Sequence, residues 1–140
     1  KVSRSAALSV ANNNGVRVPW NVTEFSIGSG MWSSAVSATE VTLPVTGFWE
    51  IWGRATWAVN ASGVRTARVV LKGTTDVTYE MDLSQGVTAT GNTNNFSDIL
   101  YLSSGSKIMM DVLQSCGAAL NLISGSTGSV FGARLVGTTA

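Results

Sequence analysis

Short runs of alternating apolar and polar residues, separated by Gly, Ser, Thr and Asn, make up most of the 140-residue chain. No segment keeps the apolar spacing of three to four residues that marks an amphipathic helix, whereas a spacing of two is typical of half-buried strands. Because the runs recur at short intervals between turn residues, the pattern predicts an all-β sandwich or barrel of about ten strands without an internal repeat. The length fits one domain over residues 1–140.

The clearest strand is predicted over residues 47–59. Successive side chains of a strand point to opposite sides of a sheet, so Phe48 and Trp52 fall on the outer face. Isolated surface aromatics are common, but two neighbours on one face favour a contact between subunits. The predicted inner set is Trp49, Ile51, Gly53, Ala55, Trp57 and Val59.

A turn at residues 60–63 and a strand over 64–72 are expected to form a hairpin with the strand before them. In that second strand, Ala67, Val69 and Leu71 face inward, and Arg68 and Lys72 face outward. Further strands are predicted over residues 6–11, 16–20, 41–43, 77–83, 96–102, 107–114 and 130–136.

Residues 84–95 are rich in Gly, Thr, Asn and Gln, and predict a long exposed loop. Its amide and hydroxyl groups could hydrogen-bond sugars, and loops on a rigid sheet often carry recognition. A loop tip without a ligand is the alternative interpretation. The candidate recognition residues are Gln85, Thr88, Asn92, Asn94 and Asn95.

Charge and hydrophobicity add a prediction about partners. Only 12% of the residues are charged, 44% are hydrophobic and five are Trp, which suggests that further copies of the chain cover part of the surface. The net charge is +1 and no basic run is present, so nucleic-acid binding is not expected. No run reaches the roughly 18 apolar residues that cross a membrane, so no membrane insertion is predicted.

The chain has no His, the commonest general base and metal ligand, and a single cysteine, Cys116. The closest acidic cluster is Asp76, Glu80 and Asp82. Such carboxylates could act as a glycosidase pair or hold calcium, but a solvated strand edge explains them as well. We therefore predict no enzyme, no metal site and no cofactor.

Four motifs, in order along most of the chain, resemble the globular head of complement component 1, subcomponent q. The first is Val41-Thr-Leu-Pro-Val-Thr-Gly-Phe-Trp-Glu-Ile51, which is similar to the family's (Val/Leu)-Pro-x-x-Gly-x-Tyr motif. Residues 63–73 resemble its Gly-x-Arg hairpin, and Leu100-Tyr-Leu-Ser-Ser-Gly-Ser-Lys-Ile108 resembles its Leu-x-Leu-x-x-Gly-Asp step. Phe131-Gly-Ala-Arg-Leu135 is similar to the closing strand.

The chain departs from these motifs at several positions. Trp49 stands where the family has Tyr or Phe, and Lys72 stands for Asn. Ser106 replaces the family's Asp, so a role of that carboxylate does not carry over. The closing glycine is displaced to Gly132.

The resemblance implies the jelly-roll fold shared with tumour necrosis factor, and a trimer of subunits side by side around a three-fold axis. We then expect four aromatic residues in the core or in subunit contacts: Phe48, Trp52, Tyr101 and Phe131. The sequence alone does not assign each of them to one or the other. The segments Val16-Arg-Val-Pro-Trp20, Gly30-Met-Trp32 and Thr56-Trp-Ala58 are similar to bacterial and bacteriophage members of the family.

The sequence suggests three candidate functions, each from a different class of protein. The first is a non-enzymatic virion module of the tail-fibre, minor-tail or capsid-decoration type, located on the particle and contacting other virion proteins or a host-surface glycan or protein. The second is a secreted signalling ligand of the tumour-necrosis type. In a secreted protein, the N-glycosylation acceptor triplets at Asn21, Asn60 and Asn95 would be expected to carry glycans. The third, a glycan-cleaving enzyme, lacks a catalytic constellation.

Overall fold

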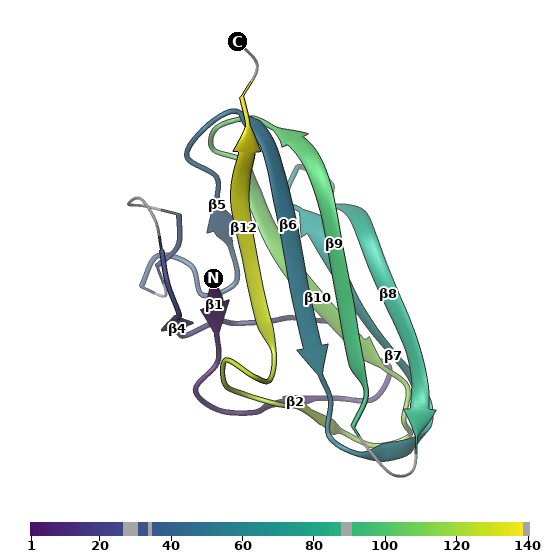
Figure 1. The fold of residues 1–140 in the computed structure, drawn as a ribbon. Coiled ribbons are helices and arrows are strands. Elements are labelled where there is room, and N and C mark those ends of the chain that lie inside the picture. Colours follow the sequence, from purple (N-terminus) through teal and green to yellow (C-terminus); the bar gives the residue numbers. More distant parts are fainter. Residues whose placement is uncertain (27–30, 34, 88–90, 139–140) are drawn as a thin grey trace.

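The computed structural model describes residues 1–26, 31–33, 35–87 and 91–138, and its strands form two packed sheets (Figure 1). The predicted all-β sandwich is confirmed. The described residues form twelve strands where about ten were expected from the pattern of short runs, because three short ones were missed. In chain order the strands are β1 (Val2–Ser3), β2 (Leu8–Val10), β3 (Val16–Arg17), β4 (Val22–Thr23), β5 (Val41–Thr42), β6 (Gly47–Thr56), β7 (Asn60–Leu71), β8 (Val77–Val87), β9 (Thr93–Leu102), β10 (Lys107–Gln114), β11 (Leu120–Leu122) and β12 (Val130–Gly137).

The two sheets are antiparallel and share no strand. The first has the order β4-β1-β12-β6-β9, and the second has the order β3-β10-β7-β8 with β5 on β10. A separate pair, β11 and β2, lies at the lower end of the molecule in Figure 1. The missed strands β1, β4 and β11 are two or three residues long, too short for an alternation to show in the sequence.

The alternation predicted for β6 is confirmed, with Trp49, Ile51 and Ala55 buried and Phe48 exposed. The strand ends at Thr56, however, and Val59 is exposed rather than inward. Beyond Thr56, Trp57 N still donates to Asn92 O at 2.8 Å, and Trp57 also forms a bridge to Leu122 of β11.

The expected hairpin between β6 and β7 is wrong. β6 pairs with β12 and β9, whereas β7 pairs with β10 and β8 in the other sheet. Residues 57–59 carry the chain from one sheet to the other, and Ala58 N donates to Asn121 O at 2.8 Å on the way. A Gly-containing turn indicates that the chain bends, but it does not indicate which strand the next segment pairs with.

Aromatic rings fill the space between the sheets. Trp20 stacks on Phe131 with ring centroids 6.0 Å apart and planes 9° from parallel, and Phe96 lies 6.3 Å from Phe131. A Cβ at Gly53 would lie 2.3 Å from Phe96 Cζ, so the glycine provides the room that this ring occupies. Single-atom changes in such a close-packed interior are felt by the whole core.

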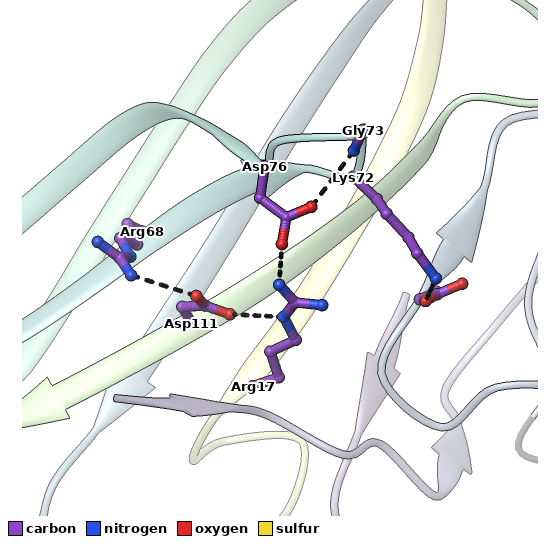
Figure 2. Close-up of polar contacts among 7 residues, drawn as sticks. Arg17, Arg68, Lys72, Gly73, Asp76 and Asp111 are labelled. Carbon is purple, nitrogen blue, oxygen red and sulfur yellow. Dashed lines mark hydrogen bonds and ion pairs between the residues drawn. The ribbon is translucent and has the colours of Figure 1, made fainter. Parts of the chain in front are cut away.

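Ion pairs cross the outward face of the second sheet (Figure 2). Arg17 of β3 contacts Asp76, which follows β7, and its Nε lies 3.6 Å from Asp111 of β10. Arg68 of β7 lies 3.3 Å from the other oxygen of Asp111. Asp76 also accepts a hydrogen bond from Gly73 N at 3.3 Å. These contacts join two strands and a turn to β10.

Glu40 forms a second set of ion pairs on this face. Lys72 donates a hydrogen bond to it, and Lys107 Nζ lies 3.0 Å from its other oxygen. The two lysines hold the pKa of the Glu40 carboxyl below its ordinary value of 4.5, the hydrogen bond from Lys72 having the largest effect and burial opposing it. Glu40 thus ties the segment before β5 to the sheet.

Replacing Glu40 with Gln tests this tie. Because the folded pKa lies below the unfolded one, the carboxylate stabilises the fold above the ordinary pKa of 4.5, and this stabilisation is lost as the pH falls through the folded pKa. We expect Glu40→Gln to be less stable than the native chain at pH 7, with the difference shrinking below pH 4.5. Urea unfolding across this range measures it, and a difference that does not change with pH would contradict the assignment.

Candidate functional site: an exposed aromatic face

Three large apolar side chains gather on the outward face of β6 and β9. Phe48 is 43% exposed, Tyr101 50% and Ile99 59%. Phe48 and Tyr101 are opposite each other in the ladder, and their ring centroids are 5.1 Å apart. Ile99 lies two residues before Tyr101 on the same face, opposite Glu50.

Trp52 extends this surface along β6. A Cβ at Gly132 of β12 would lie 2.5 Å from Trp52 Cζ2, so the indole packs over the glycine and is only partly exposed. Between Trp52 and Phe48 on β6, Glu50 is paired with Arg134. We refer to Phe48, Trp52, Ile99 and Tyr101 as the aromatic face.

Of the four residues expected in the core or in subunit contacts, Phe48, Trp52 and Tyr101 lie on this face. Phe131 is fully buried between Trp20 and Phe96, so it is a core residue and offers no contact surface. Ile99 was missed, although its alternation with Tyr101 in the run over residues 96–102 carried the signal.

The long exposed loop expected over residues 84–95 is mostly strand. β8 continues to Val87 and β9 begins at Thr93, because the backbone of this polar stretch pairs with β7 and β6. Thr88 lies outside the described residues. Of the other four candidates, Gln85 lies in β8, Asn92 is half-buried, Asn94 is fully buried and Asn95 is exposed in β9.

Asn94 joins both sheets instead of reaching solvent. Its side-chain oxygen accepts a hydrogen bond from Trp57 Nε1 at 2.8 Å. Its amide nitrogen lies 3.1 Å from Ser84 Oγ and 3.4 Å from Asp82 O. Next to it, Asn95 N donates to the Asp82 carboxylate at 2.7 Å. Buried amides of this kind hold a fold together, so Asn94 is structural.

Two of the three acidic residues singled out in the sequence have other partners, and the side chain of Glu80 lies outside what the structure describes. Asp76 is bound to Arg17, and Asp82 accepts from the β9 backbone. No group of three His, Cys, Asp or Glu side chains suited to a metal occurs in the part of the chain that the structure describes. Cys116 is buried as a free thiol. The described residues also contain no helix long and apolar enough to span a membrane.

Comparison with solved structures identifies the fold. The chain matches murine APRIL with a TM-score of 0.71 at 16% identity, covering 94% of this chain and 93% of that one. It matches the Eiger TNF from S. frugiperda with a TM-score of 0.62 at 12% identity, covering 100% and 96%. It matches the globular domain of the zebrafish complement 1qA protein with a TM-score of 0.60 at 16% identity, covering 96% and 100%.

These matches confirm the predicted jelly-roll fold of the tumour necrosis factor-like and complement 1q globular proteins. A scan against known protein families found no match, and a search of curated proteins found no relative. Nothing in the comparisons links the chain to bacteriophage proteins.

The role of Asn94 can be tested against its exposed neighbour. Asn94→Ala leaves Trp57 Nε1 without an acceptor and removes the bonds to β8, and each buried group left unpaired costs about 1–3 kcal/mol. Asn95→Ala, the matched control, removes a side chain that points to solvent. We expect urea unfolding to show a large loss of stability for Asn94→Ala alone. Equal effects of the two changes would contradict the structural role.

Proposed function

We propose that this protein is a non-enzymatic jelly-roll module that assembles with itself through the aromatic face, most simply as a homotrimer. The observation that carries this proposal is the exposure of Phe48, Ile99 and Tyr101 side by side on one sheet. A large apolar patch on a chain with few charges is typical of an interaction surface.

The energies favour an assembly in which the contact is repeated over one in which it occurs once. Complete burial of a Phe or Ile side chain stabilises by about 1.5–3 kcal/mol, so side chains that are about half exposed contribute about 1 kcal/mol each. Association costs about 4–15 kcal/mol in lost freedom, so the few kcal/mol of one such contact cover it only at the low end of that range. A ring of three subunits makes three contacts for two association events, and the resemblance to the complement 1q family implies this trimer.

The finer proposal is that the module is part of a bacteriophage particle, where it would bind a host surface or brace the virion. Its support is the resemblance of residues 16–20 and 56–58 to bacterial and bacteriophage members of the family. Several weak sites held in fixed geometry would then gain affinity by avidity. A parent gene lying beside capsid or tail genes would support this role.

A secreted ligand is the second candidate, and the similarity to murine APRIL and Eiger TNF favours it. A signal peptide on the parent gene and glycans on the acceptor triplets would support it. Both candidates predict the same self-association and no catalysis, so the test of assembly comes first.

The assembly is tested by the solution mass of the purified protein, measured by light scattering at micromolar concentration. We expect a mass three times the 14.6 kDa of one chain. Ile99→Glu and Tyr101→Glu place a charge in the contact and should reduce the mass to that of one chain, because an unpaired buried charge is costly.

Val59→Glu is the matched control, since Val59 is 57% exposed and lies outside the aromatic face. It should keep the native mass, and circular dichroism should show that all three variants remain folded. A native protein with the mass of a single chain would contradict the proposal.

A further inference from the structure

The turn between β2 and β3 exposes an Asn-Gly pair to solvent. Residues 11–15 are all exposed, although they follow Val10, which is fully buried in the core. Asn14 and Gly15 end the turn, directly before β3. This is the only place in the sequence where Gly follows Asn. Because Gly has no Cβ, its backbone can approach the preceding side chain more closely than that of any other residue.

The turn is held to the rest of the fold through the two residues before this pair. Asn13 has a φ of 55°, and its N–H donates to Gln114 O at 2.8 Å. The Asn12 side chain accepts a hydrogen bond from Gly117 N at 2.8 Å. The Asn14 side chain, in contrast, has no hydrogen-bond partner among the residues that the structure describes. Its amide group is therefore free to change conformation.

The backbone nitrogen of Gly15 is also without a partner. β3 is the outer strand of its sheet, with β10 on one side. Val18 N donates to Met110 O at 2.9 Å, and Val16 is opposite Val112 in the same ladder. Since successive N–H groups of a strand point to opposite sides, the N–H of Gly15 points away from β10. Within the described ranges of the chain, it donates no hydrogen bond.

We propose that Asn14 is a modification site, where the side-chain amide is converted to aspartate and isoaspartate by reaction with water. The Gly15 nitrogen gives its proton to the solvent and attacks Cγ of Asn14. Ammonia leaves as the new C–N bond closes a succinimide ring, and water then opens the ring at either carbonyl. The net reaction consumes water and releases ammonia, with no oxidation or reduction.

The absence of a side chain at position 15 makes the attack possible. The Cβ of any other residue would stand beside the attacking nitrogen and hinder its approach to Asn14. The fold itself does not require a glycine here. A Cβ added at Gly15 would meet only Leu113 Cδ1, at 4.0 Å, and Gly15 does not have a positive φ. Gly15→Ala can therefore keep the native turn and slow the reaction.

Other asparagines lack this combination of features. Asn21 exchanges hydrogen bonds with Ser5, and the Asn60 side chain accepts one from Ser62 N at 2.8 Å. Asn94 is fully buried. None of the three is followed by Gly. They serve as internal references in the same protein sample.

The reaction would change the charge of the chain and the length of its backbone. The formal net charge is +1, so one added carboxylate per chain brings it to zero. A net charge near zero promotes association and precipitation of proteins. Isoaspartate also adds a methylene to the main chain, next to the bond from Asn13 N to Gln114 O. Stored protein should therefore become less soluble as Asn14 is converted.

This inference does not depend on the proposed assembly. β2, which leads into the turn, lies at the lower end of the molecule in Figure 1, whereas β6 begins at the upper end. Phe48 of the aromatic face is the second residue of β6. The Asn-Gly pair and that end of the aromatic face are therefore far apart.

The test is incubation of the purified protein for several weeks at physiological temperature and pH, followed by digestion at mildly acidic pH and peptide mass spectrometry. We expect the fragment ions that contain Asn14 to gain about 1 Da, and isoaspartyl methyltransferase to label the same peptide. Asn21, Asn60 and Asn94 should stay unchanged over this time. Absence of the change at Asn14, or equal change at the exposed Asn21, would overturn the proposal.

Two comparisons separate the contribution of glycine from that of the folded turn. Gly15→Ala, shown by circular dichroism to be folded, should react more slowly by about tenfold or more. A synthetic peptide of residues 11–17 gives the rate without the fold, and the native protein should react at a similar rate because both groups are unbound. Equal rates for the native chain and Gly15→Ala, or a native protein that hardly reacts while the peptide does, would overturn the proposal.

Discussion

Three aromatic rings from distant parts of the chain meet in the middle of the sandwich, and the remaining structure depends on their contact. Trp20 comes before the short strand β4, Phe96 lies in β9 and Phe131 lies in the last strand. Their packing holds the segment that carries Trp20, just before β4, against the sheet β4-β1-β12-β6-β9. Gly53 of β6 makes room for the Phe96 ring. This packing fixes the register of β6 as well as its position between β12 and β9.

This inward packing determines what the same strands show outward. In β6, Phe48 and Glu50 alternate with the inward Trp49 and Ile51. In β9, the outward residues beside them are Ile99 and Tyr101. A shift of one residue would exchange the two faces, so the core and the aromatic face are specified by one register. The outward face of the other sheet is different, because ion pairs of Arg17, Arg68 and Asp111 cross it.

Local patterns predicted the strands well and their partners poorly. The alternation of residues 47–56 and 107–114 gave both strands, because each has one buried face. The hairpin expected after β6 was wrong because the sheet to which a strand belongs is decided by long-range packing, here by the crossing at Trp57 and Ala58. The polar stretch over residues 84–95 was assigned to a loop, since composition does not reveal that the buried Asn94 side chain finds four hydrogen-bond partners.

The central claim is that the aromatic face is covered in solution by other copies of the chain. The two tyrosines of the sequence provide a direct measurement. Within one chain Tyr79 is 44% exposed and Tyr101 is 50% exposed, so an isolated chain would present them equally to a tyrosine-specific reagent. Nitration of the native protein with tetranitromethane, read out by peptide mass spectrometry, should modify Tyr79 and spare Tyr101. Equal modification of both residues would contradict the account.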